Sequence, residues 1–215
     1  METRKFTNLM WSEIEPLYKE LVEHPFVVQL AKGTLSKVCF EHYLTQDILY
    51  IRDDAKALDI MSERATTEDE RQFFAAMSAD NITIEQALQT DYLQHFDMKE
   101  ATQQSPAIKA YTDFLLASVK DDKYAVGAAA LLPCFWVYHK VGKHVIEFSV
   151  GNNPYQKWID TYSGDEFEVY VQQFIDIVEK TAKNATADTQ TEMIDAFVQA
   201  TEYELAFFNE AISIE

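Results

Sequence analysis

The sequence predicts an all-α protein, and three observations lead to that prediction. Apolar residues recur at helical spacing along nearly the whole chain. Only five glycines and five prolines occur among the 215 residues, so parallel sheets and glycine-rich phosphate loops are not expected. Residues typical of helix ends separate the apolar segments. We count about eight helices and no convincing strand, and we expect a single-domain helical bundle over residues 1–215.

The first three helices are expected before residue 64. The first runs from about Thr7 to Glu23 and ends at His24-Pro25, because the residue before a proline avoids the α region. A short helix follows from Phe26 to Ala31, and Gly33 is suited to the left-handed cap that stops it. A long helix then starts at Ser36 and reaches about Glu63.

Capping signals place the middle of the chain. Thr67 and Glu70 form a capping-box signature for a helix over roughly Glu68 to Phe96. Ser105-Pro106 supplies an N-cap and a first helical position for the next helix, which ends at the charged residues 120–122. The helices after it are expected to end near Phe148, Tyr162, Lys183 and Ile212, with Gly164 as the terminator of the short one that opens at Asn153-Pro154.

Composition narrows the function classes. Asp and Glu outnumber Lys and Arg by 36 to 18, for a net charge of −18, and this balance disfavours nucleic acid as a partner. The segment METRKFTNLMW lacks an apolar core of signal-peptide length. The longest uncharged run, residues 124–138, is shorter than the ~20 residues of a membrane span, so no membrane partner is expected. The two cysteines then suggest reduced thiols in a cytoplasmic protein.

A buried thiol is the first candidate for chemistry. The segment Ala128 to Gly142 is apolar on nearly every face, so its helix should be buried. Pro133 should kink that helix beside Cys134, and Tyr138 shares a face with the thiol one turn later. Two interpretations remain open, because a buried cysteine is either a small hydrophobic residue or a functional thiol in a polar setting.

The last helix carries one carboxylate on its apolar face. Glu204 stands at the centre of an apolar stripe, whereas the other acids of this helix point away from it. An ionised carboxylate in an apolar interior is costly unless it is paired, so Glu204 is a candidate for a raised pKa and an acid–base role. The alternatives are a position at the helix rim or a buried ion pair with Arg. The stripe comprises Met193, Phe197, Ala200, Phe207, Phe208 and Ala211.

The long helix from Ser36 repeats this pattern with two acids. Asp47 and Asp54 fall on the same apolar face, and the helical wheel alone does not choose between them. Asp47 has the more aromatic surroundings, with Tyr43 and Tyr50 one turn away on either side. Asp54 lies beside the charged pair at positions 52 and 53, so we expect it at the surface.

A thiol and two carboxylates on three helices suit a flat, partly polar ring that stacks on Tyr or Phe. The two carboxylates would hold the ring nitrogen and exocyclic amine of a heteroaromatic base, and the thiol would add to the ring as a nucleophile. There is no Glu-x-x-His motif and no Cys/His zinc spacing, so we expect no metal and no cofactor. His139 and His144 are interpreted as part of a solvated helix edge.

Five segments together resemble the TenA family, the thiaminase II or aminopyrimidine aminohydrolase proteins of the haem-oxygenase-like fold, over nearly the whole chain. The two most specific are LLPCFWVYHKVG and YQKWIDTYSGDEF. The five segments are HPFV at 24–27, YLTQDILY at 43–50, LLPCFWVYHKVG at 131–142, YQKWIDTYSGDEF at 155–167 and TEYELAFF at 201–208.

The resemblance implies hydrolysis of 4-amino-5-aminomethyl-2-methylpyrimidine to the 5-hydroxymethyl compound and ammonia in thiamin salvage, with thiamin typically cleaved by the same chemistry. Cys134 matches the family's nucleophile, and Glu204 matches the acid–base carboxylate on the ring nitrogen and amine. Asp47 matches the carboxylate on the exocyclic amine. The positions that match substrate-binding aromatic residues are Tyr50, Tyr111, Tyr138, Tyr162 and Phe207.

The chain also departs from the family pattern. Gln89 stands where many members have His, and Phe208 replaces a common Trp. The resemblance further implies a homotetramer. Two alternatives remain: a haem-handling protein of the same fold with His24 as axial ligand, and a non-catalytic pyrimidine-binding or regulatory protein. The sequence does not rank thiamin against its degradation products.

Overall fold

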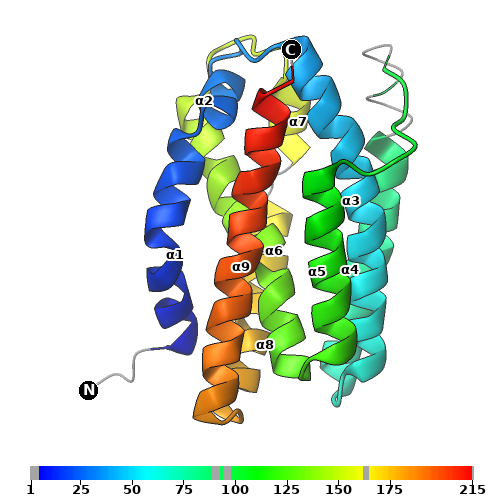
Figure 1. Ribbon diagram of the computed structural model, residues 1–215, viewed down its shortest axis with the longest axis vertical. Helices are drawn as coiled ribbons and strands as arrows, with labels where there is room; N and C mark the ends of the chain where they lie inside the picture. Colours follow the sequence, from blue (N-terminus) through cyan, green and yellow to red (C-terminus); the bar gives the residue numbers. More distant parts are fainter. Residues whose placement is uncertain (1–4, 89–92, 94–97, 162–164, 215) are drawn as a thin grey trace.

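The computed structural model describes residues 5–88, 93, 98–161 and 165–214, and for residues 161, 165 and 166 only the backbone. Nine helices and no strand occur within these ranges, so the all-α prediction is confirmed there. The long helices stand side by side as a bundle, with the short α2 and α7 near one end (Figure 1). Their bounds are α1 Phe6–Glu23, α2 Pro25–Ala31, α3 Lys37–Arg64, α4 Glu68–Ala87, α5 Pro106–Asp121, α6 Tyr124–Phe148, α7 Gln156–Thr161, α8 Asp165–Lys183 and α9 Ala187–Ile212.

Helix α6 lies inside the bundle, as its all-round apolar sequence predicts. It packs against α9, α8, α5 and α2, and the residues from Ala128 to Leu132 are fully buried. Pro133 stands inside this helix, which continues on both sides of it. Helix α3 packs mainly against α4 and α5. The apolar faces of α3, α5, α6 and α9 therefore converge on one core.

The cap residues expected from the sequence make their contacts. The Thr67 hydroxyl accepts a hydrogen bond from the Glu70 amide, and the Ser105 hydroxyl accepts one from the Ile108 amide. Gly33 has a φ of +65°, and a Cβ added there would lie 2.9 Å from Cδ of Pro154. Only glycine therefore fits this turn without strain.

Three expectations need comment. The helix expected to reach Phe96 ends as α4 at Ala87, and most of the positions that follow, Gln89 included, lie outside the described residues. The interpretation of His139 as part of a solvated edge is wrong, since the side chain is only 3 % exposed. Glu210, one of the acids of the last helix expected on its solvated face, is half-buried: it accepts a hydrogen bond from the Ala107 amide at 3.0 Å and pairs with His42 at 2.9 Å.

No helix within the described ranges is both long enough and apolar enough to cross a membrane.

Candidate active site

A cavity opens between α3, α4, α5, α6 and α9, with one wall residue from α8. It holds about 570 Å³ of space between its walls, counting the mouth that is open to solvent. Its walls carry three carboxylates, one amide, one thiol and three phenols, and the rest is apolar. The polar lining is Asp47, Asp54, Glu204, Asn81, Cys134, Tyr50, Tyr111 and Tyr138, and the apolar lining is Ile51, Ile84, Phe135, Phe167 and Phe207.

Both candidate acids of α3, Asp47 and Asp54, line this cavity. Asp47 is 5 % exposed and Asp54 only 2 %, so the expectation of a surface position for Asp54 is wrong. The two residues are seven positions apart and share a face of the helix, and that face looks into the core. Asn81 of α4 donates a hydrogen bond of 2.7 Å to Oδ2 of Asp54. This hydrogen bond offsets part of the free-energy cost of burying the Asp54 carboxylate.

Burial changes the acidity of Asp54. Loss of water around the carboxyl raises its pKa to about 7, and the neighbouring Asp47 adds to the rise. Hydrogen bonds from Asn81 and Cys134 act in the opposite direction, because both stabilise the ionised form. The carboxyl of Asp54 is therefore able to exchange a proton near neutral pH.

Cys134 presents its thiol to the cavity from the middle of α6. Its Sγ lies 3.8 Å from Oδ1 of Asp54 and 3.2 Å from the Leu131 carbonyl oxygen one turn back. Burial raises the pKa of the thiol well above its usual value, and the charges of Asp54 and Glu204 raise it further. The resting group is therefore a neutral thiol, and attack on an electrophile needs a base to remove its proton.

Glu204 faces the cavity from α9, as its place in the apolar stripe predicts. It is 2 % exposed and accepts a hydrogen bond of 2.7 Å from the Tyr111 hydroxyl. Burial raises the pKa of Glu204 to about 8; the Tyr111 hydrogen bond opposes this rise, and Asp47 and Asp54 reinforce it. Glu204 is therefore mostly protonated at neutral pH and can donate a proton to a ligand.

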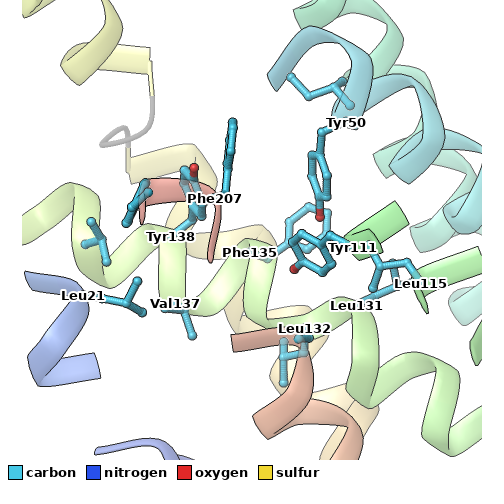
Figure 2. Close-up of a cluster of buried hydrophobic side chains, with 14 of the residues drawn as sticks. Leu21, Tyr50, Tyr111, Leu115, Leu131, Leu132, Phe135, Val137, Tyr138 and Phe207 are labelled. Atoms are coloured by element: carbon cyan, nitrogen blue, oxygen red, sulfur yellow. The ribbon is translucent and has the colours of Figure 1, made fainter. Parts of the chain in front are cut away.

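Aromatic side chains form the remaining walls. Figure 2 shows Tyr50 reaching from α3 towards Tyr111, and the two ring centroids are 5.0 Å apart. The Tyr50 hydroxyl is buried and makes no hydrogen bond of good geometry within the described part of the chain. Tyr138 and Phe207 lie near each other, and both contact Tyr43, Tyr138 through its hydroxyl and Phe207 by ring stacking at 4.8 Å. A flat ligand in this cavity therefore meets the faces of aromatic rings and the buried Tyr50 hydroxyl.

Six of the seven other predicted site residues line the same cavity as Cys134: Asp47, Tyr50, Tyr111, Tyr138, Glu204 and Phe207. The seventh, Tyr162, lies outside the described residues. Asp54 and Asn81 were not assigned to the site from the sequence. The sequence does indicate that Asn81 faces the core, because it lies on one stripe of its helix with Phe74, Met77 and Ser78. All four side chains are buried.

His24 lies away from the cavity. Its Nδ1 accepts a hydrogen bond from the Phe26 amide at 3.2 Å, and its Nε2 lies 3.2 Å from Oδ1 of Asn209. Both ring nitrogens are therefore in use as helix-end contacts, which argues against His24 as a haem ligand. In the described ranges no group of three or more His, Cys, Asp or Glu side chains has the geometry of a metal site.

The cavity walls define what kind of ligand fits. The described lining holds three carboxylates and no Lys, Arg or His. A ligand that offers N–H donors or positive charge would satisfy these carboxylates, whereas a phosphate or carboxylate would be repelled. The ring walls favour a planar body for that ligand.

The chain is similar to known proteins over nearly its whole length. The sequence model of the TENA/THI-4/PQQC family matches residues 11–213. The chain is 34 % identical over 207 residues to the thiamine biosynthesis multifunctional protein ThiED of Corynebacterium efficiens, a match that covers 96 % of this chain and 28 % of that protein. It thus spans only about a quarter of the length of the ThiED proteins it matches.

Two further matches run over most of both partners. The aminopyrimidine aminohydrolase of Bacillus subtilis is 32 % identical over 192 residues, which cover 87 % of this chain and 81 % of that protein. The solved structure of a TenA homologue from P. horikoshii OT3 superposes with a TM-score of 0.88 at 26 % identity, covering 98 % of this chain and all of that one.

Proposed function

Because the chain belongs to the TENA/THI-4/PQQC family, we propose that it is a hydrolase acting on an aminopyrimidine of the thiamin type. The proposed reaction converts 4-amino-5-aminomethyl-2-methylpyrimidine and water to the 5-hydroxymethyl compound and ammonia, as a step of thiamin salvage, and the same chemistry would cleave thiamin. One observation carries this proposal: Cys134, Glu204 and Asp47, from three helices, line a single aromatic-walled cavity.

Substrate binding would use the carboxylates and the rings. Glu204 would hold a ring nitrogen together with the 4-amino group, and Asp47 would accept a hydrogen bond from the exocyclic amine. Both side chains are buried, so these hydrogen bonds form in a setting where they are strong. Phe207, Tyr111 and Tyr138 would pack against the ring, and the buried Tyr50 hydroxyl would form a hydrogen bond to the substrate. Tyr162 stays a prediction for the same role.

Catalysis would begin with addition of the thiol to the ring. Cys134 bonds to a ring carbon beside the one that bears the methylene, and the displaced electron pair is received at the ring nitrogen as Glu204 protonates it. The pKa of Glu204, raised to about 8 by burial, supports its role as this acid at neutral pH. The ring then expels the amine from the methylene, water adds there, and loss of the thiol restores the aromatic ring.

An ammonia-release assay with the purified protein tests the proposal. 4-Amino-5-aminomethyl-2-methylpyrimidine should give one ammonia per hydroxymethylpyrimidine, and thiamin measured alongside ranks the two substrates. Tight binding of both compounds without turnover would instead favour the non-catalytic binding protein. A haem Soret band in the purified protein would revive the haem-handling alternative.

The proposal has consequences for the cellular setting. A nucleophilic Cys134 must be a free thiol, which supports a reducing compartment such as the cytoplasm. The homotetramer implied by the family resemblance is part of the proposal, and light scattering coupled to size exclusion tests it by the mass in solution.

A further inference from the structure

We propose that Asp54, oriented by Asn81, takes the proton from the Cys134 thiol during attack and later gives it to the leaving group. This assignment rests on the proposed function, since the attack it serves is the one proposed there. It divides the acid–base work between two carboxylates, with Glu204 acting at the ring and Asp54 acting at the sulfur.

The two oxygens of Asp54 have different neighbours. Oδ2 accepts the 2.7 Å hydrogen bond from the Asn81 amide, and this contact fixes the plane of the carboxylate. Oδ1 faces Sγ of Cys134 at 3.8 Å, within the range of a long hydrogen bond to sulfur. Among the described residues, Asp54 is the carboxylate that accepts a hydrogen bond from this thiol. Glu204 instead holds the Tyr111 hydroxyl.

The surroundings of Asp54 suit a group that gains and loses a proton. The titratable groups that share its cavity are acids, phenols and the thiol: Asp47 and Tyr50 on α3, Tyr111 on α5, Cys134 and Tyr138 on α6, and Glu204 on α9. Helix α4 contributes the neutral Asn81 and α8 the apolar Phe167. With no cation in the described lining to hold it ionised, the carboxyl of Asp54 has a pKa raised by burial to about 7.

The step balances in atoms and electrons. The S–H bond of Cys134 breaks and its proton moves to Oδ1 of Asp54, while the sulfur electron pair forms the C–S bond. The ring π pair that is displaced becomes an N–H bond with the proton of Glu204. When the substituent leaves, the N–H proton returns to Glu204, the electron pair moves through the ring, and the departing amine takes the proton from Asp54. Both carboxylates then regain their starting states.

A substrate-free experiment tests the Asp54–thiol pair. The rate of alkylation by iodoacetamide is measured against pH, and the Cys134 and Cys39 peptides are quantified separately by mass spectrometry. In the wild type, the Cys134 rate should show a lower step near pH 7, where Asp54 ionises and assists, and a higher step at the thiol's own ionisation. D54N should lose the lower step and keep a single one. Persistence of the lower step in D54N overturns the assignment.

Three further variants make this result specific. D59N, at an exposed acid on the same helix, should keep both steps. E204Q should also keep the lower step, because Glu204 does not contact the sulfur in this scheme; loss of the step in E204Q would transfer the role to Glu204. N81A keeps the Asp54 carboxyl but removes a hydrogen bond to its ionised form, so the lower step should move to higher pH. N81A thus tests the assignment even if D54N folds poorly.

Turnover supplies the second readout. With the aminopyrimidine, D54N should lose about 100-fold or more in kcat with little change in KM, as loss of a general base typically does. Removing the Asp54 charge also lowers the thiol pKa, so a purely electrostatic role predicts an unchanged or faster D54N. Such a result overturns the assignment. A wild type with the Asp54-dependent step but no turnover would reject the proposed function and leave the proton transfer standing.

Discussion

The pKa values of buried carboxylates shift in opposite directions at two places in this protein. Asp54 and Glu204 face the cavity, and burial raises their pKa values to about 7 and about 8. Glu70, in the first turn of α4 and outside the cavity lining, is also buried, at 4 % exposure. Burial alone would raise the pKa of Glu70, but hydrogen bonds from Lys180 at 2.7 Å and from Tyr124 at 2.9 Å outweigh it and lower the pKa.

The carboxylates at the two sites receive different partners. A carboxylate that receives a cation and a phenol is stabilised as an anion, and it contributes to holding α4, α6 and α8 together. A carboxylate that receives only neutral donors is left able to bind a proton. Scarcity of basic partners therefore distinguishes the candidate active site from an ordinary buried ion pair.

The largest expected effect comes from removing the thiol that the cavity carboxylates surround. C134S should keep the fold, because the change is nearly isosteric, and should lose on the order of 10⁴-fold or more in kcat. Ammonia release and a thermal melt measure the two properties. C39S is the matched control, since Cys39 is a buried thiol whose contact is the Ile214 carbonyl, and it should keep its activity. Rates near the wild type in C134S would remove the nucleophile assignment.

The second effect separates the two glutamates directly. E204Q should lower kcat by about 10²- to 10⁴-fold, because an amide cannot donate and regain the proton that the ring needs. E70Q makes the same change at an equally buried site outside the cavity and should leave kcat within about twofold. If only KM rises in E204Q, Glu204 binds the substrate without acting as an acid.

The third effect is a dependence of stability on pH. Between about pH 4 and pH 8 the folded protein holds protons on Asp54 and Glu204 that the unfolded chain releases. These two groups contribute their full stabilisation at pH values below their pKa values in the unfolded chain. The free energy of unfolding then falls as the pH rises to the folded-state pKa values of about 7 and 8. At 1.36 kcal/mol per pKa unit the loss is of the order of a few kcal/mol per group. Urea titrations across this range should show E204Q with a flatter dependence than the wild type.

The smallest effect concerns the ion pair. E70Q should destabilise the protein by only about 1 kcal/mol at neutral pH, because the Lys180 side chain is 57 % exposed and its charge is screened. The same variant should be indistinguishable from the wild type once acid has protonated Glu70. A loss of several kcal/mol at neutral pH would show that the pair is a main support of the bundle.

The sequence predicted most of the helices because their signals are local. Thr67, Ser105 and Gly33 mark helix ends through contacts within a few residues, and each makes the expected contact or turn. The buried position of Glu204 followed from one helix alone, since its stripe is apolar on both sides.

The parts that sequence reasoning missed depend on partners from other helices. Asp54 looked like a surface residue because its neighbours at positions 52 and 53 are charged, yet those neighbours are on other faces of α3. The helical wheel did put Asp54 on the apolar face with Asp47, and its 2 % exposure and the hydrogen bond from Asn81, 27 residues further on, show that it turns inward. His139 is another case, because the ring of Phe167 from α8 lies against it in a way that its own helix does not indicate.

Glu210 gives the bundle a fixed axial register. Its carboxylate joins His42 of α3 and the first turn of α5 to α9, and these three helices carry Asp54, Tyr111 and Glu204. Glu210 lies six residues beyond Glu204, or about 9 Å along the helix axis. A slip of about 1 Å between these rods would break the 2.7 Å contact from Tyr111 to Glu204. The contacts of Glu210 at the end of the bundle thus help to keep the side chains of Asp54, Tyr111 and Glu204 aligned.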